Sequence, residues 1–330
     1  MGIAPLNAHV ANDTLKIEWS DGHKSQFSKD WLLRHSTMQD SLSYRGLPQS
    51  WVPWTNLEVP HVSWEKYMDK TSEEFKSAVS GLESYGLLQI RGIPEGELYE
   101  GKPMVEHLAT QIGGYPKTTF YGTSWNVKSV KEARNVAYTS VFLPLHMDLL
   151  YYESPPGLQL LHVIQNSTSG GESYFSDSYA AALKIKKEDP EAYNALKVVP
   201  LSYHYVNDGQ HYFQMRPVIV ENPYGGFIDH FNYSPPFQGP LDSVNQLDDR
   251  LFDAFTRGLT AFETFVEAPE NQIQFKMEPG TCIVFYNRRV LHARREFDAS
   301  SGDRWFKGTY TDIDSFYSLV RTLNGNAVEQ

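Results

Sequence analysis

Three metal-ligand candidates place the strongest constraint on how this chain can fold. His146 and Asp148 lie on either side of one residue, and on an extended strand two residues at that spacing point to the same face. The third candidate, His292, lies far along the chain. If all three hold one metal ion, the fold must bring the segment around residue 292 alongside the segment around residue 146.

Two imidazoles and one carboxylate on one face of a metal leave other positions open, as an iron(II) that activates O₂ requires, although manganese or cobalt fits the same ligands. The triplet alone is a weak signal, because the chain has 11 His and 40 acidic residues. Its surroundings strengthen it. Val141, Phe142 and Leu145 make the approach to His146 strand-like, and residues 281–292 resemble a buried strand, a turn and a second strand ending in histidine.

An arginine follows in a further strand candidate, the aromatic segment 304–310. A guanidinium on a core-facing strand needs an anionic partner, because burying an unpaired charge is very costly. Its planar fork of N–H groups suits a carboxylate. Arg304 is therefore a candidate for binding an acidic small molecule.

Several motifs in a fixed order between Phe120 and Asp314 resemble the γ-butyrobetaine dioxygenases, within the iron(II)- and 2-oxoglutarate-dependent oxygenases related to taurine dioxygenase. The resemblance covers about two-thirds of the chain. The matching stretches are residues 119–122 with Trp125, 135–139, 145–148, 156–162, 170–173 and 291–295.

This resemblance implies an α+β fold with a distorted double-stranded β-helix (a jelly-roll, cupin-like core) and flanking helices. It implies Fe(II) held by His146, Asp148 and His292, with 2-oxoglutarate and O₂ as co-substrates. Arg304 and Ser173 would bind the distal carboxylate of 2-oxoglutarate, and Leu161 would line the same site. A homodimer is also implied.

The resemblance extends to the substrate. Aromatic residues match positions that form a cage around a trimethylammonium group, which has no N–H to donate and is recognised by ring faces worth about 0.5–2 kcal/mol each. Aromatic residues make up 14% of the chain, so any one of these positions alone has an ordinary structural explanation. The cage candidates are Tyr121, Trp125, Tyr138 and Tyr310, and Asn135 and Asn232 match positions that hold the substrate carboxylate.

Three functions are open at this stage. The first is hydroxylation of γ-butyrobetaine or a similar quaternary ammonium carboxylate, as in carnitine biosynthesis, with trimethyllysine as a close variant. The second is a tailoring oxygenase of secondary metabolism that hydroxylates, desaturates or rearranges another small molecule. Pro235 and Pro236, which depart from the family near Asn232, favour it. The third, a non-catalytic binding protein, is disfavoured because every ligand candidate is present.

Composition limits the kinds of molecule that the protein can bind. The formal net charge of −11 disfavours nucleic acid and anionic membranes. No apolar run reaches the length of a membrane span, and the first residues lack the pattern of a signal peptide. The only cysteine, Cys282, lies in an apolar strand candidate. We therefore expect a cytoplasmic enzyme with a small-molecule substrate.

A proline-rich stretch containing Pro48, Pro53 and Pro60 predicts a boundary between a small domain, residues 1–50, and a catalytic domain, residues 51–330. The small domain resembles part of the N-terminal domain of γ-butyrobetaine dioxygenase. That domain carries a zinc held largely by cysteines, which this segment lacks, so we expect no zinc here. Strands are predicted at 15–19, 23–27 and 87–90, a capped helical turn at 28–34, and helices at 63–85, 98–112, 178–196 and 244–266.

Overall fold

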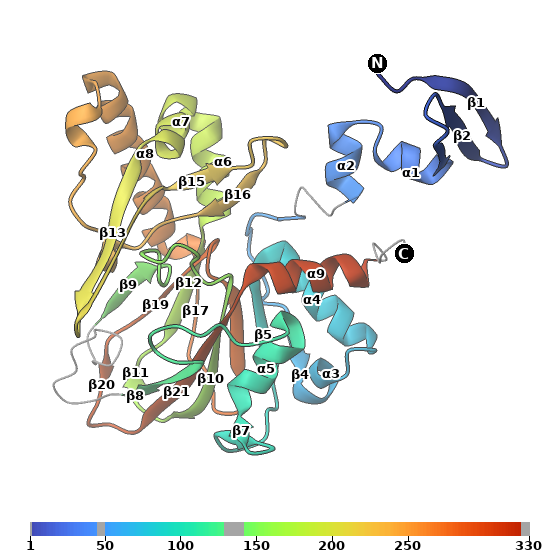
Figure 1. The fold of residues 1–330 in the computed structure, drawn as a ribbon. Coiled ribbons are helices and arrows are strands. Elements are labelled where there is room, and N and C mark those ends of the chain that lie inside the picture. Colours follow the sequence, from blue (N-terminus) through green and yellow to red (C-terminus); the bar gives the residue numbers. More distant parts are fainter. Residues whose placement is uncertain (1, 45–49, 129–141, 325–330) are drawn as a thin grey trace.

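The computed structural model describes residues 2–44, 50–128 and 142–324. The fold is a mixture of helices and mainly antiparallel strands, with two principal sheets (Figure 1). The larger sheet has the order β4(His61–Ser63), β5(Leu87–Arg91), β18(Cys282–Tyr286), β10(Leu158–Asn166), β21(Arg304–Thr311), β8(Ser124–Lys128). The smaller has the order β17(Gln272–Phe275), β12(Ser173–Asp177), β19(Val290–Arg294), β9(Leu143–His146).

The chain passes back and forth between these sheets. Strands β8, β10, β18 and β21 belong to the larger sheet, whereas β9, β12, β17 and β19 belong to the smaller one. Strand β19 pairs with β9, and His292 is the register partner of His146. The predicted alignment of these two distant segments is confirmed.

Helices cover the outer face of the larger sheet. The helices α3(Trp64–Met68), α4(Glu73–Tyr85), α5(Met104–Gly113) and α9(Ile313–Leu323) pack beside it (Figure 1). Every residue of β18 and of β19 is buried, as expected of strands covered on both faces. The apolar run 282–286, with Cys282 as a small buried residue, therefore lies in the core as predicted.

A second group of helices packs against the end of the smaller sheet. It consists of α6(Ser178–Glu188), α7(Pro190–Val198) and α8(Asp249–Glu267). The neighbouring hairpins are β13(Pro200–Asn207) with β14(Gln210–Pro217) and β15(Ile219–Glu221) with β16(Ile228–Phe231). The remaining short elements are β6(Leu98–Tyr99), β7(Lys102–Pro103), β11(Ser169–Gly170), β20(Phe297–Asp298), η2(Pro235–Phe237), η3(Val244–Gln246) and η4(Pro269–Asn271).

Capping residues explain where the predicted helices were too long. The helix expected over 63–85 is two helices, because Ser72 accepts a hydrogen bond from the backbone of Phe75 and starts α4. The helix expected over 178–196 breaks at Asp189, which ends α6 and caps α7. Asp248 likewise starts α8. Residues 98–103 form a hairpin rather than a helix, so α5 begins only at Met104.

The N-terminal segment forms a small unit set apart from the two sheets (Figure 1). Its sheet consists of β1(Pro5–Ala11), β2(Thr14–Trp19) and β3(Lys24–Ser28), followed by α1(Lys29–Arg34) and α2(Met38–Tyr44). The predicted hairpin is confirmed, and Ser28 caps α1 by accepting from the backbone of Trp31. Strand β1 was missed although Leu6, Ala8 and Val10 alternate with polar residues; the strand is almost wholly exposed, so its apolar side chains add nothing to a buried face.

None of the helices in the described ranges combines the length and the apolar character needed to cross a membrane.

Candidate active site

The three predicted metal ligands converge at the junction of β9 and β19. One ligand atom from each of His146, Asp148 and His292 lies within 4.8 Å of the others, and no other such group occurs among the described residues. Asp148 follows the end of β9 rather than lying in it, so the spacing argument gave the correct neighbours through a turn instead of a strand. Asn287 fixes that turn, accepting from the amide of Asp148 at 2.8 Å and donating to its carbonyl at 2.9 Å.

The protonation of the cluster fits a divalent cation. His146 Nδ1 lies 2.8 Å from the carbonyl of Pro144, which can only accept, so Nδ1 carries a proton and Nε2 is the nitrogen that faces Asp148. That Nε2 lies 3.2 Å from Asp148 Oδ1. Burial, and then His146, lower the pKa of His292 to about 3. Two imidazole nitrogens and a carboxylate oxygen within 4.8 Å of one another can share one metal ion, and the cluster therefore suits a metal ion.

The carboxylate is ionised despite its burial. Burial favours the neutral acid, but His146, His292 and Tyr310 together outweigh it and hold the pKa of Asp148 below its usual value. Tyr310 donates from its hydroxyl to Asp148 Oδ2 at 2.7 Å. Asp148 therefore brings a negative charge to the ligand set at neutral pH.

A cavity of about 90 Å³ adjoins the cluster and is called the central pocket below. Strands of both sheets supply its walls. Its lining residues are Trp125, Val127, Leu143, His146, Asp148, Gln159, Leu161, Ser173, Phe175, His292, Ala293, Arg294, Arg304 and Phe306. The structure thus brings the predicted Leu161, Ser173 and Arg304 to one cavity with the metal ligands.

Arg304 has the surroundings of an anion-binding residue. It is 8% exposed and forms no ion pair with any carboxylate in the described part of the chain. Burial, and then Arg294, lower the pKa of Arg304 to about 9, while its guanidinium carbon lies 4.0 Å from the centre of the Phe306 ring. A buried, charged guanidinium of this kind needs an anionic ligand. The hydroxyl of Ser173, 3.3 Å from Met277 Sδ, lines the same space.

Arg294 was not predicted as a site residue. It lies on β19 two residues after His292, so the spacing that linked His146 to Asp148 points here too. Arg294 lines the central pocket and is 5% exposed. Burial lowers its pKa to about 10.

Three of the four cage candidates form a continuous aromatic wall. The ring centres of Trp125 and Tyr310 are 4.2 Å apart, and those of Tyr121 and Trp125 are 5.9 Å apart. The wall reaches the metal ligands through the Tyr310 hydroxyl. Tyr138 and Asn135 lie outside the described residues.

Asn232 is engaged elsewhere. Its side-chain amide donates to the carbonyl of Pro217 at 2.7 Å and accepts from Arg288 at 2.6 Å. It does not line the central pocket within the described residues. These contacts hold the β15–β16 region together and lend no support to the predicted contact with the substrate.

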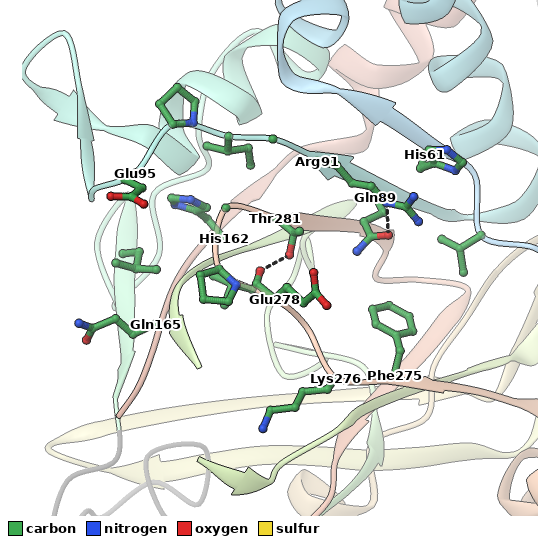
Figure 2. A pocket seen from close by; sticks show the side chains of 18 of the residues that line it. His61, Gln89, Arg91, Glu95, His162, Gln165, Phe275, Lys276, Glu278 and Thr281 are labelled. Atoms are coloured by element: carbon green, nitrogen blue, oxygen red, sulfur yellow. Dashed lines mark hydrogen bonds between the residues drawn. The ribbon is translucent and has the colours of Figure 1, made fainter. Parts of the chain in front are cut away.

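A larger cavity of about 1080 Å³, called the outer groove below, lies on the other side of the larger sheet (Figure 2). Leu161 lines the central pocket whereas its neighbour His162 lines the groove, because successive strand residues face opposite ways. The groove also holds charged and ionisable side chains from several segments, namely Glu58, His61, Arg91, Glu95, Lys276 and Glu278. They form no metal-ligand group among the described residues.

Comparisons with known proteins agree with this geometry. The family model described as "Taurine catabolism dioxygenase TauD, TfdA family" matches residues 43–310. Dioxygenase str8 of Strobilurus tenacellus is 37% identical over 94% of this chain and 74% of its own length. Gamma-butyrobetaine dioxygenase of a Pseudomonas species is 31% identical over 94% of this chain and 78% of its own. A taurine dioxygenase structure from Burkholderia xenovorans has a similar fold, with a TM-score of 0.54 and 15% identity over 78% of this chain and 89% of that chain.

Proposed function

The chain belongs to the TauD, TfdA family of dioxygenases, and on that premise we propose that it hydroxylates an unactivated C–H bond of a small quaternary ammonium carboxylate, with γ-butyrobetaine as the best candidate. The enzyme is a 2-oxoglutarate-dependent dioxygenase that uses Fe(II), 2-oxoglutarate and O₂. Bound iron supplies the activation of O₂, coupled to decarboxylation of 2-oxoglutarate to succinate.

Different residues of the central pocket would position the iron and the 2-oxoglutarate. His146, Asp148 and His292 would hold the iron, because they offer two imidazoles and one carboxylate. Arg304 would bind the distal carboxylate of 2-oxoglutarate, with the Ser173 hydroxyl beside it and Leu161 lining the same cavity. The mostly apolar lining of the pocket would limit the water around the reacting atoms.

The alternation of strands between two sheets supports assigning the core to a distorted double-stranded β-helix. In that arrangement β9 and β19 lie side by side in one sheet, while β10 and β21 face them from the other. The metal ligands and Arg304 therefore approach the same cavity from opposite sheets.

The observation that carries the substrate proposal is the aromatic wall of Tyr121, Trp125 and Tyr310, which adjoins the metal ligands. Ring faces attract a cation that has no N–H, by about 0.5–2 kcal/mol for each ring. A trimethylammonium group against this wall would lie beside Asp148, the metal-ligand candidate to which Tyr310 donates. Asn135 and Tyr138 remain predicted contacts outside the described residues.

A second candidate, a tailoring oxygenase acting on another small molecule, has its own support. The fungal dioxygenase str8 is more similar to this chain than the Pseudomonas γ-butyrobetaine dioxygenase is. Pro235 and Pro236, which depart from the γ-butyrobetaine pattern, begin the short helix η2, and η2 contacts the metal-bearing strand β9. A different loop beside the metal site would favour a different substrate. The homodimer and the cytoplasmic location stay predictions under either candidate.

The test is a panel of γ-butyrobetaine, trimethyllysine, simple amino acids and 5,5-dimethylhexanoate, supplied with iron and 2-oxoglutarate. The last compound is the isostere of γ-butyrobetaine in which an uncharged carbon replaces the cationic nitrogen. We expect γ-butyrobetaine to stimulate succinate release most and the isostere to stimulate it least. Trp125→Leu should raise the KM for γ-butyrobetaine about tenfold, the loss of roughly one ring–cation contact. Trp305→Leu is the matched control, since Trp305 is absent from the lining of the central pocket.

If no member of the panel stimulates succinate release in a protein shown to bind iron and 2-oxoglutarate, the substrate class is wrong and the second candidate replaces it. Equal stimulation by γ-butyrobetaine and by 5,5-dimethylhexanoate would show that the aromatic wall does not recognise the cationic group.

A further inference from the structure

We propose that Tyr310 is a positioning residue for the metal site, whose hydroxyl holds one oxygen of Asp148 and leaves the other free for the metal. The inference deepens the proposed function, because it rests on the same metal ligands. It differs from the family-based expectation for Tyr310, which concerns only the face of its ring.

The two oxygens of Asp148 lie in different surroundings. Oδ2 accepts a hydrogen bond of 2.7 Å from the hydroxyl of Tyr310, whereas Oδ1 lies 3.2 Å from His146 Nε2. A carboxylate that turns freely can bind a metal through both oxygens and so fill a position that the co-substrates need. Oδ2 also lies 3.9 Å from His292 Nε2, but with Oδ2 occupied by Tyr310, Oδ1 is the oxygen that remains available to the ligand cluster.

The remaining freedom of Asp148 is small. Its backbone is held on both sides by Asn287, so rotation of the side chain is the principal freedom left. The Tyr310 bond removes that rotation. Hydrogen bonds of this kind around metal ligands commonly change metal affinity or activity by 10- to 100-fold when they are lost.

Tyr310 is itself held firmly enough to act as a support. It is 2% exposed and lies on β21 opposite Gln159 of β10. Its carbonyl accepts from the amide of Lys117 at 2.7 Å, and its ring packs against Trp125. The hydroxyl is committed to Asp148, so only the ring is left for a substrate. One residue therefore joins the aromatic wall to the metal ligands.

Tyr310→Phe separates these two roles, because it keeps the ring and removes the hydroxyl. The apoprotein is titrated with Co(II), and affinity and the visible d–d spectrum are recorded. We expect about tenfold weaker Co(II) binding and a changed spectrum, since the carboxylate can turn and bind through both oxygens. With saturating iron, the KM for γ-butyrobetaine should change less than twofold, because the ring remains.

Tyr203→Phe is the matched control. Tyr203 is fully buried and donates its hydroxyl to the carbonyl of Asn232 at 3.0 Å, without contact to the metal ligands. Co(II) affinity and spectrum unchanged in Tyr310→Phe, or altered equally in both variants, would overturn the inference. These readouts need no substrate, so a failed substrate panel with the expected Co(II) result would remove only the γ-butyrobetaine proposal.

Discussion

The central pocket and the outer groove contain similar kinds of side chain but have opposite character. The groove is the larger by far, about 1080 Å³ against about 90 Å³, and both contain imidazoles, carboxylates and guanidinium groups. In the central pocket both imidazoles and both guanidinium groups are buried, and the half-buried carboxylate of Asp148 converges with the imidazoles on one point. In the groove, His61 and Arg91 are exposed. Convergence and burial, rather than volume, therefore distinguish the candidate active site.

One strand serves both cavities. In β10, Leu161 faces the central pocket and His162 faces the groove. His292 of the central pocket has two ligand partners, whereas His162 Nδ1 is buried without a hydrogen-bond partner in the described part of the chain. The two histidines are both held neutral by burial, yet only one belongs to a ligand set.

Removing a metal ligand should have the largest effect on the central pocket and none on the outer groove. His292→Ala should abolish both iron binding and turnover, because two ligands remain where three are needed for a tight site. The measurement is iron content after equilibration together with succinate release. His61→Ala in the outer groove is the matched control and should leave both unchanged. Turnover surviving in His292→Ala would refute the ligand assignment.

A smaller effect is expected from the anion site. Arg304→Gln should raise the KM for 2-oxoglutarate about 100-fold, since losing one member of a buried charged pair costs about 2–5 kcal/mol and each 1.4 kcal/mol is tenfold. Kinetics with saturating iron measure this. Arg91→Gln, an exposed arginine of the groove, should leave this KM unaltered. An equal response in the two variants would show that Arg304 acts through general charge and not as a ligand.

Much of the candidate site could be predicted because its residues combine chemistry with strand periodicity. His146, Asp148 and His292 are polar residues that lie among apolar ones, and Arg304 opens a strand whose residues are mostly buried. The turn that carries Asp148 was not predictable, because it depends on Asn287, which comes from a segment more than a hundred residues away.

The fold was predicted less evenly. Helix lengths were overestimated where Ser72, Asp189 and Asp248 act as caps, since an apolar stripe can continue across a break. The engagement of Asn232 by Arg288 and the hydroxyl bond of Tyr310 depend on tertiary contacts. In these cases the residue's type and position predicted the region where it lies, but its hydrogen-bond partners could be identified only from the packed structure.

The smallest expected effect concerns His162 and sharpens the contrast between the two histidines. Burial lowers the pKa of His162 to about 4, against an ordinary value near 6.5. The unfolded chain therefore takes up a proton below about pH 6.5 that the folded chain refuses until about pH 4. Folding stability from this group is fully present above pH 6.5 and is lost as the pH falls through that window.

His162→Leu should remove this dependence. Between pH 7.5 and 5.0 the wild-type protein should lose about 2 kcal/mol more unfolding free energy than the variant, at 1.36 kcal/mol per pKa unit. Urea unfolding at both pH values measures it, and taking the difference cancels the packing change. The neighbours across the sheet, Cys282 and the ion-paired Lys307, are present in both proteins. Equal pH dependence in the two proteins would show that folding does not lower the pKa of His162. Iron binding should be unchanged, because the described residues that line the groove form no metal-ligand group.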